Sequence, residues 1–174
     1  FAAVNTVISP VIATIEVTPH FFNGAVTCDG PSKTFTITVY PSGQVNDPGD
    51  QVLCNGSPTT PVTFSTSNLG GTTTYTWTIT ASGIGLAASG SGDIPSFAVV
   101  NIGSSPVIGT IAVTPHFSNG SVTCDGPVQT FTITVNPTGQ VNKPLDQTVC
   151  SGSNTTAITF ATANSVGVTT YDWI

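Results

Sequence analysis

The chain contains almost no positive charge. It has no arginine and no methionine, and its only lysines are Lys33 and Lys143, so that eight acidic residues give a net charge of -6. Only 6% of its residues are charged, against about a quarter in an average soluble domain. Such a chain has few cations with which to neutralise phosphate groups. We therefore expect no binding to nucleic acids or to anionic membrane surfaces.

Long apolar runs are also missing. No stretch approaches the roughly 20 apolar residues of a membrane-spanning helix, and no helical spacing of apolar residues persists over a dozen positions. We therefore expect essentially no helix and no membrane insertion. The 39% hydrophobic content is interleaved with threonine, so disorder is not expected. No signal peptide is visible and Phe1 lies within a repeat, so we interpret the chain as part of a longer polypeptide.

What the sequence does contain is a repeat with a fixed offset of 96 residues. Of the 78 positions that can be compared (174 minus 96), 51 are identical, and the alignment needs no gap. A repeat of this length and regularity indicates a tandem array of small domains. Catalysis needs one well-formed site, so the duplication favours a role in reach, avidity or assembly.

Alternation of apolar and polar residues predicts an all-β fold. In residues 73–79, Tyr75, Trp77 and Ile79 fall on one face and threonines on the other, and residues 130–135 alternate in the same way. This pattern is typical of antiparallel strands with one solvated face, where β-branched threonine is favourable. Turn signals rich in glycine, asparagine and serine lie between such segments. About seven short strands in roughly 100 residues predict tandem immunoglobulin-like β-sandwich domains.

The complete repeat is expected to place a tryptophan at the centre of its core. Burial of Trp77 contributes on the order of 3 kcal/mol. Seven strands are predicted, at roughly 44–54, 62–66, 73–79, 84–88, 97–101, 107–114 and 130–135. The predicted core consists of Trp77, Tyr75, Val62, Phe64, Ile111, Phe131 and Ile133.

Short segments with proline and glycine, at 39–44 and 135–140, are expected to link the domains stiffly. With domain boundaries in these two linkers, residues 41–136 form one complete domain. Residues 1–40 are then the C-terminal strands of a preceding repeat, and residues 137–174 are the N-terminal strands of a following one. Neither fragment can bury a core by itself. Together they lack only the equivalent of 79–96.

Four sequence strings carry a resemblance to a known family: DQVLCNGS, TTYTWTI, IGLAASGSGDIPSF (Ile84 to Phe97) and SPVIGTIAVTP, with KTFTITV in the first copy. On these strings the chain resembles the immunoglobulin-like (PKD-like) tandem repeats of Bacteroidota cell-surface proteins. Such repeats are stacked in giant adhesins, including gliding-motility adhesins of the type IX secretion system. The resemblance covers the entire chain and implies an extracellular stalk or filament with no enzymatic activity. It is imperfect after Trp77, where the acidic, glycine-rich turn of the PKD module is replaced by Thr-Ile-Thr.

In an exported chain, two cysteines per repeat at fixed positions indicate disulfides. We favour an intradomain bond between Cys54 and Cys124, which closes a loop of about 70 residues and contributes roughly 4 kcal/mol in the chain-entropy model. Cys28 and Cys150 then have partners in adjacent copies. Cys54 and Cys124 would lie at opposite poles of a regular sandwich, so the bond between them requires an irregular first strand, broken at Pro48-Gly49. Bonds across the linkers, Cys28–Cys54 and Cys124–Cys150, are the alternative, and without a CxxC pair zinc is not expected.

No residue is predicted to be catalytic. His20 and His116 share one repeat position, and we interpret them as turn or strand-end residues, because abundant serine and aspartate single out no partner for them. The aspartates occur singly and are interpreted as solvated, with a calcium site at a domain junction as the alternative. No lysine recurs between the copies, which excludes a repeated isopeptide bond. No cofactor is expected.

Two classes of function remain. We expect a structural or adhesive repeat unit of an extracellular surface fibre, with neighbouring copies and a surface or glycan ligand as partners. The alternative is an accessory or carbohydrate-binding module of a secreted enzyme, for which only Phe21 and Phe22 form an exposed-looking aromatic pair. The terminal fragments are either adjoining domains cut short, which is the simpler interpretation, or halves completed between subunits by strand complementation.

Overall fold

The computed structural model describes residues 2–80 and 83–174, and within these residues it contains ten strands and no helix. This confirms the predicted all-β class. Accordingly, nothing in the described ranges is a helix able to cross a membrane. The strands are β1 (Val11–Val17), β2 (His20–Asn23), β3 (Val26–Asp29), β4 (Lys33–Val39), β5 (Gln51–Cys54), β6 (Thr72–Thr80), β7 (Ser89–Ser91), β8 (Val107–Asn119), β9 (Val122–Asp125) and β10 (Gln129–Asn136).

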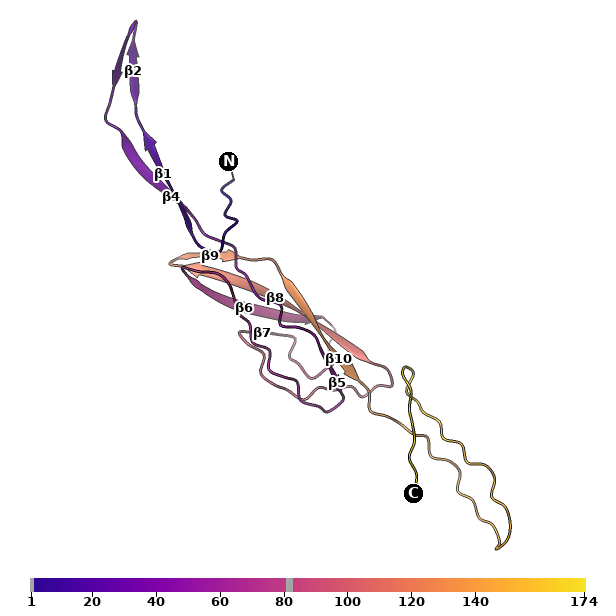
Figure 1. Cartoon of the computed structure of the whole chain (residues 1–174). Helices are drawn as coiled ribbons and strands as arrows, with labels where there is room; N and C mark the ends of the chain where they lie inside the picture. Colours follow the sequence, from indigo (N-terminus) through magenta and orange to yellow (C-terminus); the bar gives the residue numbers. More distant parts are fainter. Residues whose placement is uncertain (1, 81–82) are drawn as a thin grey trace. The chain divides into compact units, whose positions relative to one another are not determined.

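The largest of three sheets has six strands, in the order β5-β10-β8-β6-β7, with β9 paired to β8 (Figure 1). β5 runs parallel to β10 and places Cys54 beside Asn136. β9 runs antiparallel to the end of β8. Isolated antiparallel bridges, including one between Val62 and Ile94, hold segments outside these strands. The arrangement is consistent with a β-sandwich.

Three of the seven predicted strands are not regular strands. Segments 62–66 and 97–101 retain only isolated bridges, and 84–88 has no strand pairing. Pro61 and Pro95 flank the bridged residues and cannot donate to a ladder. Gly85 has a φ of 90°, which is incompatible with an extended strand. The predicted first strand is likewise reduced to its end, β5, because Pro48 and Gly49 interrupt it.

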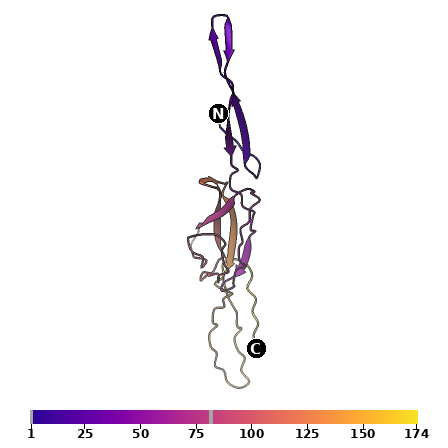
Figure 2. The same ribbon diagram turned by 90° about the vertical axis from the view of Figure 1, so that its left-hand side faces the viewer.

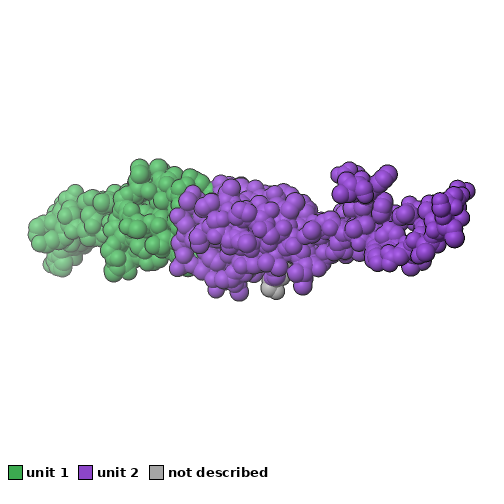
Figure 3. All heavy atoms as spheres, turned by 90° about the horizontal axis from the view of Figure 1, so that it is seen from below, with its two compact units in different colours: residues 1–46, 64–76, 113–129 green, residues 47–63, 77–112, 130–174 purple. Residues whose placement is uncertain are grey.

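By contact density the chain divides into two units (Figure 3). One comprises residues 1–46, 64–76 and 113–129, and the other comprises residues 47–63, 77–112 and 130–174. Strands β6 and β8 contribute residues to both.

The core is built from alternate positions of the strands. In β8 and β10 every second residue is buried, as the period-2 pattern requires. The seven residues predicted to form the core are all buried, Trp77 among them. A Cβ added to Gly90 would lie 2.2 Å from Cζ2 of Trp77, so only glycine fits beside this ring. The indole N–H of Trp77 donates to the carbonyl oxygen of Gly92 at 3.1 Å.

The terminal segments form less complete structures. In residues 1–40, β1 pairs with β4 over seven residues, and β2 pairs with β3, both antiparallel (Figures 1 and 2). Residues 137–174 contain turns but no assigned strand. They nevertheless keep a backbone hydrogen bond of the complete repeat: Asn142 N–H donates to Ala161 at 2.9 Å, as Asn46 does to Ser65.

Candidate assembly interface

An asparagine holds the N-terminal segment in the shape of the complete repeat. Nδ2 of Asn101 donates to the carbonyl oxygens of Ser105 and Val135, at 2.9 and 2.7 Å. Asn5 makes the same two bonds to the equivalent residues of its own segment, also at 2.9 and 2.7 Å. The two hydrogen bonds of Asn101 are therefore reproduced in residues 1–40, although β8 is one strand and its equivalent is divided into β1 and β2.

A second asparagine does the same for the C-terminal segment. Oδ1 of Asn68 accepts from the backbone N–H of Gln44 at 2.7 Å, and its Nδ2 donates to the carbonyl oxygen of Ser42 at 3.1 Å. Asn164 makes both bonds with the equivalent residues, at 2.8 and 3.1 Å. Both terminal segments thus retain these asparagine hydrogen bonds of the complete repeat. No recognised motif marks these asparagines, and their identity between the copies is the only signal of them in the sequence.

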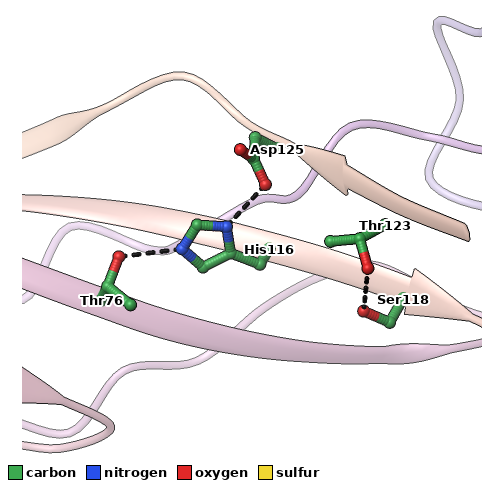
Figure 4. Close-up of polar contacts among 5 residues, drawn as sticks. All are labelled: Thr76, His116, Ser118, Thr123 and Asp125. Atoms are coloured by element: carbon green, nitrogen blue, oxygen red, sulfur yellow. Dashed lines mark hydrogen bonds and ion pairs between the residues drawn. The ribbon is translucent and has the colours of Figure 1, made fainter.

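A histidine connects three strands in the complete repeat (Figure 4). Nδ1 of His116 in β8 lies 2.6 Å from Oδ1 of Asp125 in β9, and its Nε2 lies 2.8 Å from Oγ1 of Thr76 in β6. A hydrogen bond between Ser118 and Thr123, 3.1 Å long, forms the next rung between β8 and β9. Strand registry is thereby reinforced by side chains on the solvated face.

The order hydroxyl, imidazole, carboxylate is the one that acyl-transfer enzymes use. Here the hydroxyl belongs to a threonine in the interior of β6, where the strand holds it on the surface of a sheet. In the other copy the His20–Asp29 pair recurs at 2.6 Å, but the residue equivalent to Thr76 is Asp172, which cannot serve as a nucleophilic hydroxyl. We therefore interpret the arrangement as a structural clamp.

Replacing His116 by alanine is expected to lower the free energy of unfolding by about 1–2 kcal/mol, because two hydrogen bonds between strands are lost. The matched variant His20→Ala removes one contact between exposed side chains and should cost less than about 0.5 kcal/mol. Urea unfolding followed by circular dichroism measures both. Equal losses would contradict the clamp interpretation.

The cysteines require a correction. All four are described, and Cys28, Cys54, Cys124 and Cys150 form no disulfide within the chain. The bonds expected from Cys28 and Cys150 to adjacent copies stay a prediction. The expected Cys54–Cys124 bond is not formed. Cys54 lies beside Asn136, the last residue of β10, whereas Cys124 precedes that strand. Eight extended residues span roughly 26 Å, far beyond the usual Cα separation of about 4.4–6.8 Å in a disulfide. The linker-spanning bonds are not formed either.

Metal ligands do not gather in the described part of the chain. No group of three or more histidine, cysteine, aspartate or glutamate side chains there is placed to hold a metal ion. Asp50, one of the residues considered for calcium, instead accepts a hydrogen bond of 2.7 Å from the backbone N–H of Thr132. Its carboxylate thus fixes the approach to β5 against β10.

Phenylalanines that the complete repeat buries are exposed in the N-terminal segment. Phe131 and Phe117 are 2% and 0% exposed, whereas their equivalents Phe35 and Phe21 are 52% and 67% exposed. The residue types are identical, so the difference comes from the missing packing partner. Large apolar side chains that are exposed here and buried at the equivalent positions indicate a candidate interaction site.

The C-terminal segment shows the complementary exposure. Trp77 and Phe64 are 6% and 9% exposed, but their equivalents Trp173 and Phe160 are 80% and 40% exposed. Trp173 and Phe160 line, with Ile158 and residues 143–147, a hollow of about 720 Å³. The equivalents of its three apolar side chains, Val62, Phe64 and Trp77, are buried in the complete repeat, whereas residues 47–51, the equivalents of 143–147, are exposed or half-buried there as well.

Two equivalent glycines, Gly43 and Gly139, show that a close main-chain contact of the complete repeat is absent in the C-terminal segment. The N–H of Gly43 donates to the carbonyl oxygen of Cys124 at 3.1 Å, and a Cβ added to Gly43 would lie 2.5 Å from the oxygen of Pro115. At the equivalent Gly139, nothing lies within 4 Å of an added Cβ. The glycine is retained where its close contact is missing.

No protein-family model matches the chain, and a search of curated proteins finds no match. The resemblance to Bacteroidota surface repeats therefore remains a hypothesis that rests on the sequence strings quoted above.

Proposed function

We propose that the chain is a structural or adhesive repeat unit of an extracellular fibre or giant adhesin stalk at a bacterial cell surface. Its immunoglobulin-like (PKD-like) domains are joined head to tail, and it is not an enzyme. One observation carries the proposal: the chain combines a buried repeat with two exposed half-repeats that keep the same local hydrogen bonds.

The proposed role is mechanical. A fibre requires modules that resist shear, and the parallel register of β5 with β10 supplies main-chain hydrogen bonds along the strands. Side chains add further cross-links, from Asp50 to Thr132 and from His116 to Thr76 and Asp125. Solvated threonine faces with few charges permit close lateral approach without desolvation of ions.

The alternative, a carbohydrate-binding module, is favoured by the exposed pair Phe21 and Phe22, because aromatic rings stack on sugars. The repeat weakens this argument. Phe117, the equivalent of Phe21, is fully buried, and the equivalent of Phe22 is Ser118. The exposure of Phe21 is thus explained by the packing partners that its equivalent has and it lacks, which leaves only Phe22 of this pair as support for a sugar-stacking site.

Electron microscopy of the purified chain at high concentration is expected to show unbranched threads, while glycan arrays probed at the same concentration show no selective binding. Antibodies against the chain should label intact cells of the source bacterium. Compact particles that bind one class of glycan would instead support the carbohydrate-binding module.

A further inference from the structure

We propose that, when residues 1–174 stand as a separate chain, the apolar face of residues 1–40 binds the apolar face of residues 137–174 of a second copy. The two chains would then complete between them the module that residues 41–136 form within one chain. This inference rests on the proposed function as a head-to-tail repeat, and it adds the partner, the two faces and the strand register.

The register follows from the complete repeat. There β5 lies parallel to β10, with Val52 opposite Thr134 and Leu53 opposite Val135. The residues equivalent to those of β10 lie one repeat earlier, at the end of β4 and in Tyr40, and the residues equivalent to β5 lie one repeat later, at 147–150. The same register therefore pairs the end of β4 in one copy with residues 147–150 of another. Thr38 then lies opposite Thr148, and Val39 lies opposite Val149.

Main-chain hydrogen bonds of the complete repeat support the same pairing of the two segments. In the complete repeat the N–H of Gly56 donates to Val99 at 2.8 Å, and the N–H of Val99 donates to Ser57 at 2.9 Å. Their equivalents Gly152, Ala3 and Ser153 keep every backbone donor and acceptor that these two bonds need. Because the two segments are already shaped by Asn5 and Asn164, little ordering is required on binding.

The side chains are complementary in the same positions. Gly71 admits the ring of Phe117, since an added Cβ would lie 2.5 Å from its Cζ. The equivalent Gly167 has nothing within 4 Å of an added Cβ, and the equivalent Phe21 is exposed. The open hollow beside Ile158 and Trp173 offers a place for the side chains that β1 and β4 leave exposed. Each half thus displays what the other lacks.

The composite module is less complete than its template. It has no counterpart of residues 79–96, which supply Gly90 beside Trp77 and the buried Ile84 and Ile94. Asp172 also replaces Thr76 opposite the histidine position. We therefore expect an association that is reversible on dilution, in contrast to the permanent fold of residues 41–136.

An engineered disulfide tests the register in the full chain. Thr38 and Thr148 are both exposed, and with the four native cysteines replaced by serine, the pair Thr38→Cys and Thr148→Cys is expected to cross-link copies into a ladder of covalent oligomers. The ladder should collapse on reduction, and peptide mapping should find residue 38 joined to residue 148. The matched pair Val52→Cys and Thr134→Cys, in the same background, should form a bond within one chain and yield only monomer.

Three results would overturn the inference. In the first, the matched pair cross-links but Thr38→Cys/Thr148→Cys does not. In the second, the latter pair bonds only within one chain, which makes the partner the same copy. In the third, oligomers form through symmetrical 38–38 bonds, which makes the contact isologous. Threads seen by electron microscopy without the 38–148 bond would leave the proposed fibre intact and refute this junction alone, whereas the bond without threads would refute the fibre.

Discussion

Replacing Trp77 by alanine is expected to lower the free energy of unfolding by about 3–5 kcal/mol, as removal of a large core aromatic generally does. The ring is buried, a Cβ at Gly90 would overlap it, and its N–H donates to the carbonyl oxygen of Gly92. Typical domains have only about 5–15 kcal/mol of stability in total, so this variant should be close to unfolding. Urea unfolding followed by circular dichroism measures the loss.

The repeat supplies the matched variant, Trp173→Ala. That ring is exposed, so in dilute solution its removal should change the stability by less than about 0.5 kcal/mol. If the ring is an anchor of the interface between copies, its loss should weaken self-association by about tenfold or more. A large loss of stability in the dilute Trp173→Ala protein would mean that residues 137–174 are folded against a core of their own, contrary to the structure.

A single methyl group at Gly43 is expected to have the second-largest effect. The new Cβ would overlap the carbonyl of Pro115, which belongs to the backbone of β8 and cannot rotate away. Overpacking of this kind costs about 3 kcal/mol, and the displaced backbone also endangers the hydrogen bond from Gly43 to Cys124. The melting temperature of Gly43→Ala should fall by about 10 °C or more, as calorimetry can measure.

Gly139→Ala places the same methyl group at the equivalent position, where there is open space. Its melting temperature at low concentration should match that of the unaltered chain. In the complex between copies, however, the methyl group would meet the carbonyl of Pro19, the equivalent of Pro115, and self-association should be lost. If Gly139→Ala associates as well as the unaltered chain, the register inferred for the junction is wrong.

The fold class was predictable because it depends on a simple periodicity. Alternation around Trp77 and in residues 130–135 indicates which side chains face inward, and the structure buries them except Ile79, which is half-buried. The strands at 62–66, 84–88 and 97–101 were mispredicted because short apolar segments beside proline and glycine satisfy the same pattern without entering a ladder. Periodicity reports which side a residue faces, but it does not report whether its backbone finds a partner.

The interface was only partly predictable. The complementarity of the terminal fragments follows from the repeat, whereas the partners of His116 depend on the pairing of β8 with β9 and on the position of β6, which no local pattern encodes. The cysteine prediction failed for a related reason. An even number of cysteines indicates bonds only if the fold brings them together, and here β10 separates Cys54 from Cys124.

Sedimentation of the unaltered chain over a range of concentrations tests the central claim most directly. Each copy has one face of each kind, and a head-to-tail contact between unlike faces leaves both ends open. The average mass is therefore expected to rise from 17.6 kDa through successive multiples without a plateau, and to return to 17.6 kDa on dilution. A mass that stays at that of one chain even near millimolar concentration, or that stops at two chains, would contradict the claim that the terminal segments are complementary halves of one module.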